Sequence, residues 1–343
     1  MSLRLSLALE TGELVLPEGT VSVLLPTPEC DLNGLTGSQV ELVQPFKPHF
    51  DYFQRAGFAC VTQTAAPCET AIVCLSRAKA QARASVFDAC RHSTGLVVVD
   101  GARTDGIDSI YKDVRRRVVV SGQMTKAHGR IFWFNADPGA FADWQAPDAQ
   151  MAGAYHTAPG VFSADAIDPA SQLLVAALPG KLGRHVVDLG AGWGYLAAEL
   201  LARHSKIETL DLVEADHVAL ECARRNVPDA RAQFHWADAL EWSASGAVDT
   251  VVMNPPFHRG RAGDPGLGRG FIATAARILA PGGHLWMVAN RHLPYEAALR
   301  ECFAQSEEIS GDAKFKILRA SRPISRQPDR SNPSRTRRPR ANR

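Results

Sequence analysis

Residues 186–195 have the sequence VVDLGAGWGY, in which a short apolar run is followed by three glycines at alternate positions. The apolar run is typical of a buried strand, and the residues after the last glycine have the composition of a helix. Gly190, Gly192 and Gly194 permit backbone conformations that other residues avoid, and they let a ligand approach the main chain closely. A strand, a glycine-rich turn and a helix in this order predict a nucleotide-type binding site at the helix N-terminus.

The same alternation of strands and helices continues on both sides of this turn, from about residue 150 to residue 320. The apolar pattern predicts strands at 186–189, 208–213, 248–253 and 284–289, and helices at 195–203, 217–225 and 271–279. We therefore expect an α/β fold with a doubly wound, mostly parallel sheet, in which ligands bind at the carboxyl ends of the strands.

Residues 1–145 show a similar alternation with weaker boundaries. Apolar runs predict strands at 21–25, 71–75, 95–99 and 118–120, and residues 77–90 predict a helix. The stretch 136–148 contains Pro and Asp and is typical of a linker. Two adjacent α/β halves raise the possibility of a duplication, although no residue-level repeat is evident. We predict three units: 1–145, 146–321 and a tail, 322–343.

The composition is that of a globular protein: 343 residues, 45% hydrophobic and 22% charged. Because no apolar run approaches the roughly 18 residues of a membrane span, and Glu10 and Glu13 interrupt the N-terminal segment, we expect a cytoplasmic protein without membrane association. The seven cysteines are scattered and include no C-x-x-C pair, which predicts reduced thiols and no metal site.

The tail, 322–343, contains eight arginines and one acid, giving a net charge of +7 within a chain whose total is +2. It has almost no apolar residues, so we expect it to be disordered. It is either a solubilising extension or a clamp on nucleic-acid phosphates. Arg115–Arg117 could add to a basic surface, but three arginines before a strand are more often simply solvated.

Acidic residues at the ends of three predicted strands identify the expected ligand. The pattern D-x-G-x-G-x-G differs from the dinucleotide pattern G-x-G-x-x-G. Asp188 would repel a pyrophosphate and attract the ammonium group of a methionine. Glu214 is placed to accept hydrogen bonds from both ribose hydroxyls, and Asp238 could accept one from an adenine amino group. Unless these are three unrelated acids, they predict S-adenosylmethionine as the cofactor.

The predicted strand 248–253 is followed directly by Asn254, Pro255, Pro256 and Phe257. The two prolines fix the backbone and carry no N–H. The Asn254 side-chain oxygen and the Pro255 carbonyl can then both accept hydrogen bonds from one planar amino group, while Phe257 stacks on the attached ring. Alone, this motif could be a turn. After a strand and beside the cofactor residues, it predicts methyl transfer to an amino group.

Further motifs in this order resemble one family. They are Pro159–Ser163, Asp168, Ser171–Leu174, Val288–Tyr295 and Phe315–Ala320. Over about residues 155–320 the chain resembles the ribosomal RNA small subunit methyltransferase C family and its large-subunit relatives, which make N2-methylguanine. The resemblance implies two tandem Rossmann-like class I methyltransferase domains, of which the N-terminal one is degenerate. It also implies donor binding by Asp188, Gly190, Gly192, Glu214 and Asp238, and base binding by residues 254–257.

Two features depart from the family pattern. Arg259 stands where the family usually has an acid, and residues 260–270 are unusually rich in glycine. Several other residues have two interpretations. His258 could steer a phosphate or cap its loop, and Asn290 and Tyr295 could line the pocket or belong to a turn. Lys316 alternates with apolar neighbours, which predicts a solvated position on its strand rather than an RNA contact.

We expect a monomer that acts on ribosomal RNA or on the small ribosomal subunit. Two other functions fit parts of the pattern. An N-P-P-aromatic site could also methylate adenine N6 or a protein glutamine amide, but those sites usually have Tyr in place of Phe257. A non-catalytic RNA-binding or assembly factor could use the same fold, although the intact donor residues argue against it.

Overall fold

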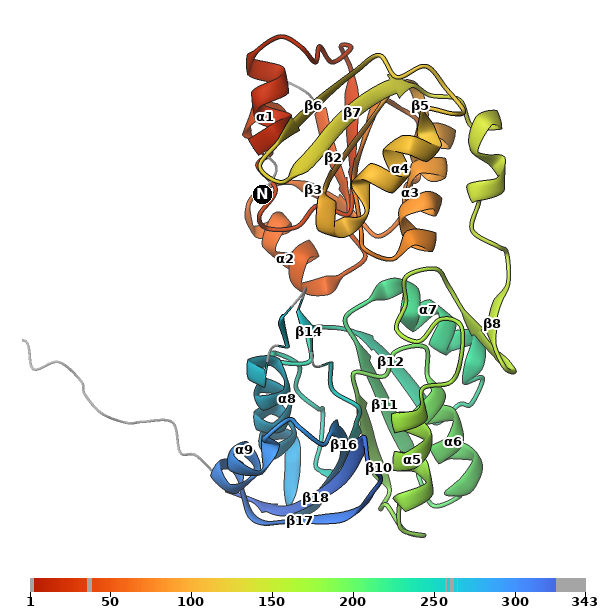
Figure 1. The fold of residues 1–343 in the computed structure, drawn as a ribbon. Coiled ribbons are helices and arrows are strands. Elements are labelled where there is room, and N and C mark those ends of the chain that lie inside the picture. Colours follow the sequence, from red (N-terminus) through yellow and green to blue (C-terminus); the bar gives the residue numbers. More distant parts are fainter. Residues whose placement is uncertain (1–2, 36–38, 257, 260–261, 264, 325–343) are drawn as a thin grey trace, which may run out of the picture.

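The computed structural model describes residues 3–35, 39–256, 258–259, 262–263 and 265–324. Within these ranges, the chain forms two α/β domains stacked one above the other (Figure 1). Each contains a seven-stranded sheet, and two short hairpins lie outside the sheets. In the described part of the chain, no helix combines the length and apolar character needed to cross a membrane.

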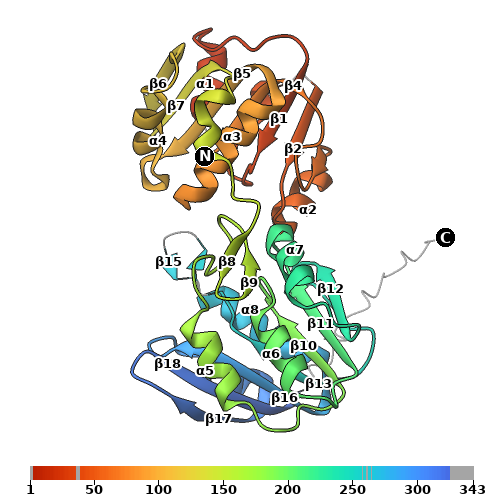
Figure 2. The same ribbon diagram turned by 90° about the vertical axis from the view of Figure 1, so that its right-hand side faces the viewer.

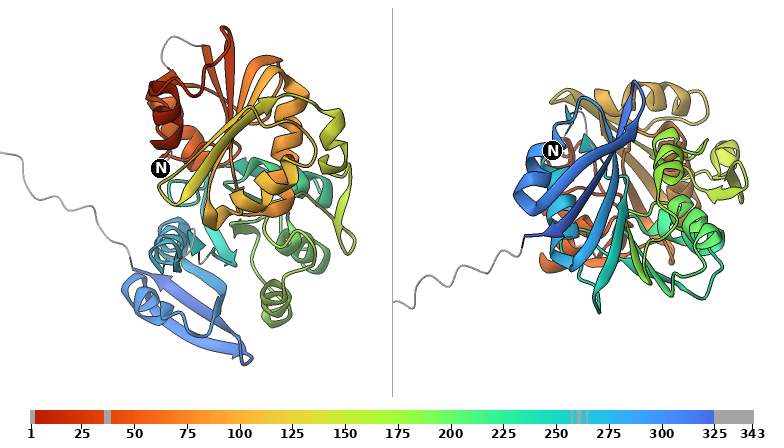
Figure 3. Two further views of the ribbon diagram at one scale, coloured as in Figure 1. Left: turned by 45° about the horizontal axis from the view of Figure 1, so that its top comes forward. Right: turned by 90° about the horizontal axis from the view of Figure 1, so that it is seen from below.

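The N-terminal sheet has the strand order β3-β2-β1-β4-β5-β7-β6. Its strands are β1 (Thr20–Leu24), β2 (Gln39–Val43), β3 (Ala59–Val61), β4 (Cys68–Cys74), β5 (Ser93–Ala102), β6 (Gly122–Lys126) and β7 (Gly129–Asn135). The helices are α1 (Leu3–Glu10), α2 (Lys47–Arg55), α3 (Lys79–His92) and α4 (Ile107–Val114), with short 3₁₀ helices η1 (Asn33–Leu35), η2 (Arg103–Asp105) and η3 (Gly139–Trp144). Helices α1 and α2 cover one face of the sheet, and α3 and α4 cover the other (Figure 3).

The C-terminal sheet has the order β12-β11-β10-β13-β16-β18-β17. Its strands are β10 (His185–Leu189), β11 (Thr209–Glu214), β12 (Ala232–Trp236), β13 (Val248–Met253), β16 (Leu279–Asn290), β17 (Phe303–Gly311) and β18 (Phe315–Pro323). The helices are α5 (Pro169–Ala177), α6 (Tyr195–Arg203), α7 (His217–Asn226), α8 (Pro265–Ile278) and α9 (Tyr295–Cys302). The hairpins are β8 (Gln150–Ala152) with β9 (Tyr155–Thr157), and β14 (His258–Arg259) with β15 (Ala262–Gly263).

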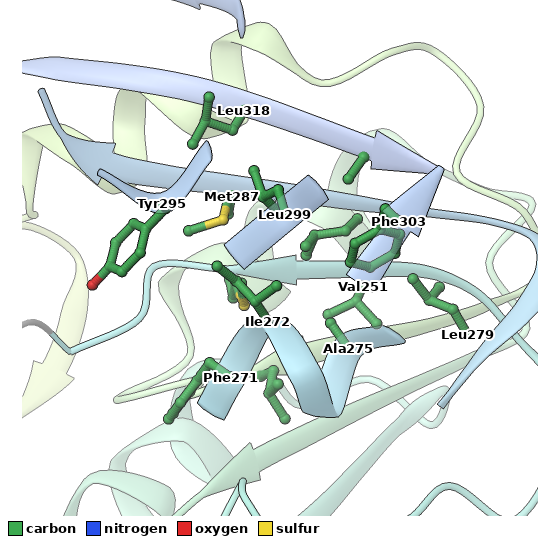
Figure 4. Packing of buried hydrophobic residues seen from close by; sticks show 14 of the residues in the cluster. Val251, Phe271, Ile272, Ala275, Leu279, Met287, Tyr295, Leu299, Phe303 and Leu318 are labelled. Atoms are coloured by element: carbon green, nitrogen blue, oxygen red, sulfur yellow. The ribbon is translucent and has the colours of Figure 1, made fainter. Parts of the chain in front are cut away.

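The core of the C-terminal domain lies on both faces of its sheet. Helices α5, α6 and α7 pack against one face, and α8 and α9 pack against the other. Figure 4 shows Phe271 and Ile272 of α8 beside Val251 and Met287 of the central strands. Since both faces are covered, the central strands are mostly apolar, and their carboxyl ends are the place for polar chemistry.

The two sheets have the same topology. Read along each sheet, β1 corresponds to β10, β2 to β11, β4 to β13, and β5 to β16. In both sheets the first five strands are parallel and the last two pairings are antiparallel, so only the sixth strand, β7 or β18, runs in the opposite direction. The prediction of tandem Rossmann-like domains is confirmed, and the shared strand order agrees with a duplication.

Several local predictions are wrong. Residues 118–120 are not a strand, because the chain leaves α4 in a turn there and Val119 is 86% exposed. Strands β6, β7 and β17 were not predicted. Residues 139–144 lie within the predicted linker, yet they form η3, whose Phe141 and Trp144 are buried against α3. The last strand, β18, runs to Pro323, and the rest of the predicted tail, 325–343, lies outside the described residues.

Candidate active site at the carboxyl edge of the second sheet

The predicted donor residues meet where β10 and β11 end. Gly190, in the turn after β10, has φ +82°, and a Cβ there would lie 3.0 Å from the Phe271 ring. Gly192 has φ +55° and faces open space. Gly194 begins α6 with φ +87°. These left-handed conformations favour glycine, so the turn needs its glycines both for its backbone and for close packing.

Glu214 connects the turn to the end of β11. One carboxylate oxygen, Oε2, accepts a hydrogen bond from the Gly192 N–H at 2.8 Å, and the other accepts one from the Asp216 N–H at 2.8 Å. Burial raises the pKa of Glu214 to about 7. The half-buried carboxylate thus stands beside the open side of the glycine turn, the position that an acid must have to bind ribose hydroxyls.

Asp188 lies fully buried in β10, and neither carboxylate oxygen has a hydrogen-bond partner among the described residues. Burial, with a smaller contribution from the charge of Glu214, raises the pKa of Asp188 to about 8. A buried carboxyl without a partner is energetically costly. Its place beneath the glycine turn therefore fits a site for the ammonium group of an S-adenosylmethionine donor.

Asp238 follows β12 by two residues and is half-buried. Its Oδ1 accepts a hydrogen bond from the Leu240 N–H at 2.9 Å, so part of its role is to form a turn. The Ala237 N–H donates to the Glu214 carbonyl at 3.0 Å, which places the Asp238 loop beside the Glu214 loop. The three acids predicted from the sequence therefore stand at three neighbouring strand ends, in the order β12, β11 and β10.

Asn254 follows β13, the next strand on the other side of β10. Its amide Nδ2 donates hydrogen bonds to Asp168 Oδ2 at 2.8 Å and to Ser171 Oγ at 2.9 Å. Because both amide protons are engaged, Oδ1 is the side-chain atom that can bind an amino group. Asp168 also accepts from the Ser171 N–H and so caps α5.

Asp168 and Ser171 appeared in the sequence only as part of the family pattern, without a role. The signal that could have found them is local: an Asp before a proline at the start of a helix is a typical cap. Pro255 is buried and Pro256 is exposed. Phe257 lies outside the described residues, and the side chain of His258 is not among those described.

Asn290 and Tyr295, the two residues that could line a pocket, lie in different surroundings in the structure. Asn290 lines a cavity of about 470 Å³ at the end of β16, together with Arg291, His292, Ala313, Lys314 and Phe315. Tyr295, in contrast, is 1% exposed and belongs to the core, so it does not line this cavity.

Lys316 corrects a prediction. It was expected on a solvated face but is 4% exposed, and its Nζ donates to Glu296 Oε1 at 2.5 Å. The strand alternation is as expected, but α9 covers the face on which Lys316 lies, so the charge is paired rather than solvated.

The N-terminal sheet has matching positions without the matching chemistry. The Leu25 N–H donates to the Val43 carbonyl in the first sheet, and the Gly190 N–H donates to the Val213 carbonyl in the second. These equivalent hydrogen bonds and the strand register align the two sheets residue by residue. The positions of Asp188, Glu214 and Asn254 are occupied there by Val23, Gln44 and Cys74. The first domain thus has the fold and none of these three polar groups. All seven cysteines are free thiols.

Comparison with known proteins gives three relevant matches. Residues 153–319 match the family model of the methyltransferase small domain. The ribosomal RNA large subunit methyltransferase G of Aeromonas salmonicida is 37% identical over 171 residues, which cover 48% of this chain and 45% of the relative. The chain thus spans about half the length of that curated relative. The ribosomal RNA small subunit methyltransferase C of Hahella chejuensis is 29% identical over 251 residues, covering 69% and 72%.

A solved structure matches both domains. The 16S rRNA N2 methyltransferase of T. thermophilus, in complex with AdoMet and guanosine, superposes with a TM-score of 0.76 at 26% identity. The match covers 94% of this chain and 92% of that one. With its tandem domains, its methyltransferase small domain match and these relatives, the chain is similar over both domains to the ribosomal RNA small subunit methyltransferase C family.

Proposed function

We propose that the protein transfers a methyl group from S-adenosylmethionine to the exocyclic N2 amine of a guanine in ribosomal RNA, with small-subunit 16S rRNA as the target. The observation that carries this proposal is the orientation of Asn254, whose two amide protons are held by Asp168 and Ser171. This arrangement presents Oδ1 as an acceptor at the same sheet edge as Asp188 and Glu214. The relatives' activity and the T. thermophilus complex with AdoMet and guanosine support the same assignment.

In this proposal three carboxylates bind the donor. Asp188 binds the ammonium group, Glu214 the ribose hydroxyls, and Asp238 the adenine amino group through the oxygen that its turn leaves available. Gly190, Gly192 and Gly194 let the donor lie against the main chain. When bound, the donor supplies a methyl group on a positively charged sulfur.

Residues 254–257 hold the nucleophile. Asn254 Oδ1 and the Pro255 carbonyl accept the two N–H bonds of the guanine amine, Pro256 keeps the backbone rigid, and Phe257 stacks on the base. Two accepted hydrogen bonds draw the nitrogen lone pair out of conjugation and point it along the line of attack. As the N–C bond forms, the bond between the methyl group and sulfur would break and leave a neutral thioether. The nitrogen then releases one proton through the same acceptors to water, so no strong base is required.

The test is methyl transfer with labelled S-adenosylmethionine to ribosomal RNA and to small subunits from cells that lack the enzyme, followed by nucleoside analysis. We expect label in N2-methylguanine of small-subunit RNA, and we propose that the protein meets this substrate in the cytoplasm. Label in N6-methyladenine or in protein would overturn the acceptor and keep the donor site. Donor binding without label in any fraction would favour a non-catalytic RNA-binding role.

A further inference from the structure

The N-terminal domain contacts the two loops that carry Glu214 and Asp238. The Lys47 N–H donates to the Ala215 carbonyl at 2.8 Å, and the His217 N–H donates to the Pro45 carbonyl at 2.9 Å. Phe46 and Asp216 form an antiparallel bridge between these bonds. Figure 2 shows the result, with α2 of the first domain lying beside α7 of the second. The segment 45–50, here called the interdomain latch, is thus paired with the loop that follows Glu214.

Trp236 joins the latch to the second loop. Its indole Nε1–H is shared between the Ala215 carbonyl at 2.9 Å and the Pro45 carbonyl at 3.0 Å. The Phe50 ring meets the indole edge-on, with 4.9 Å between the ring centroids. Lys47 Nζ lies 5.0 Å from the indole centroid and is anchored by Asp51. One tryptophan therefore connects the end of β12, the end of β11 and the first domain.

These contacts lie next to the donor residues along the chain. Ala215 directly follows Glu214, Trp236 precedes Asp238 by two residues, and the Ala237 N–H is bonded to the Glu214 carbonyl. Loops at strand ends are the more mobile parts of an α/β domain. Fixing both loops before the donor arrives lowers the entropy that donor binding must pay for, since fewer conformations remain to be ordered.

We propose that Lys47, Phe50 and Trp236 are positioning residues of the donor site, through which the degenerate first domain holds the 214–217 and 236–238 loops in their donor-binding geometry. Donor affinity then depends on a domain that lacks the donor residues itself. The inference rests on the proposed function only in taking S-adenosylmethionine as the donor. It does not depend on which acceptor is methylated.

The first test measures the dissociation constant of S-adenosylmethionine by calorimetry, with the full chain held well below its unfolding temperature. Phe50→Ala removes the ring contact with Trp236, and we expect donor binding to weaken roughly 3- to 10-fold, the equivalent of one aromatic pair. Phe50→Tyr keeps the ring and should bind like the wild type. Tyr52→Ala makes the same kind of truncation on α2 at a residue that is 45% exposed and contacts Phe53, so it should also bind normally.

The second test uses Trp236→Phe, which keeps a ring against Phe50 and removes the shared Nε1–H. We expect donor binding to weaken several-fold, and the double variant with Phe50→Ala to lose less than the product of the two single effects, because both act through one contact. In turnover, the donor KM should rise while kcat at saturating donor stays constant. A loss of folded protein would instead lower kcat at constant KM.

Each outcome bears on a defined claim. Wild-type donor affinity in both Phe50→Ala and Trp236→Phe would overturn the latch, as would an equal loss in Tyr52→Ala. Donor binding that follows the expected pattern without any methyl transfer to RNA would support the latch and overturn the proposed function. A wild-type protein that does not bind the donor would overturn both.

Discussion

Asn254 donates a hydrogen bond of 2.8 Å to Asp168, and the same carboxylate oxygen accepts the Ser171 N–H that begins α5. One oxygen therefore caps a helix and orients the side chain proposed to hold the nucleophile. Since the two tasks use different partners, substitutions at Asp168 and Asn254 can separate the stability of the fold from the geometry of the reaction.

Asn254→Ala should retain donor binding and lose methyl transfer. The side chain contributes orientation of the amine, and such losses are typically of several orders of magnitude in rate. Donor affinity by calorimetry is the internal control, because Asp188 and Glu214 are untouched. A variant with normal turnover would remove Asn254 from the mechanism.

Asp168→Ser should lower kcat by about 10-fold or more while leaving stability within about 0.5 kcal/mol. Serine caps a helix about as well as aspartate but is too short to reach Asn254, so the loss corresponds to one hydrogen bond to a charged group. Asp168→Asn keeps an oxygen in both hydrogen bonds and should recover most of the activity. Equal activity in the two variants would contradict an orienting role. Single-turnover rates and thermal unfolding measure the two quantities.

Asp188→Asn should stabilise the fold while weakening donor binding at least 10-fold. Burial raises the pKa of Asp188 to about 8, so the folded state holds a proton that the unfolded state releases near pH 4. The free energy of unfolding therefore falls as pH rises from about 4 to about 8. Removing this charge should raise stability above pH 8 by on the order of 1–2 kcal/mol, and by less towards pH 5.

Asp211→Asn is the matched control for the direction in which Asp188→Asn changes the free energy of unfolding. Burial raises the pKa of Asp211, but hydrogen bonds from His235 at 2.7 Å and His185 at 2.6 Å outweigh it, and the pKa lies below its usual value. This carboxylate stabilises the fold above its unfolded pKa, so its replacement should destabilise the protein at pH 7. If both variants shifted unfolding in the same direction, burial would not be the cause of the Asp188 effect.

Arg4→Ala should destabilise the N-terminal domain by about 3–5 kcal/mol, because it leaves Asp100 buried without its partner. The Arg4 guanidinium donates to both Asp100 oxygens, at 2.6 and 3.1 Å, and the two side chains are 5% and 7% exposed. Arg184→Ala breaks a pair with Glu208 that is exposed on both sides and should cost far less, because solvent screens the two charges. Urea unfolding followed by circular dichroism gives both values, and similar costs would refute the prediction.

Deletion of residues 325–343 should weaken RNA binding mainly at low salt. The segment follows the last described residue and carries seven arginines and Asp329. If it binds phosphates, its loss should flatten the slope of log affinity against log salt, with the two proteins converging at high salt. Donor affinity should not change. Equal RNA affinity of both proteins at 50 mM salt would make the tail incidental to binding.

Glycine and proline residues mark the ends of several helices and strands, and the bounds of those elements were predicted well from the sequence. The helix at Tyr195–Arg203 and the strand at Val248–Met253 have the predicted bounds, because a glycine turn precedes one and a proline pair follows the other. The acids at the strand ends could be grouped into one site because parallel strands bring their carboxyl ends to one edge of the sheet.

The elements and contacts that the sequence did not predict lie at exposed sheet edges or join residues far apart in the chain. Strand β6 has the sequence GQMTK, whose side chains are mostly exposed, so no apolar alternation marks it. Residues 118–120 carry three valines and no sheet partner. The contact between Pro45 and Trp236 joins residues 191 positions apart, and no local pattern encodes it.

The latch also has a symmetry. By strand register, Pro45 is the counterpart of Ala215 and Lys47 is the counterpart of His217, and the two hydrogen bonds between them are reciprocal. At this contact the domains therefore meet through equivalent residues of each half, as the subunits of an isologous twofold dimer do. The protein is arranged as a dimer of two α/β units within one chain. Both units use the same segment at this contact, and only the second has Asp188, Glu214 and Asn254 at the matching strand positions.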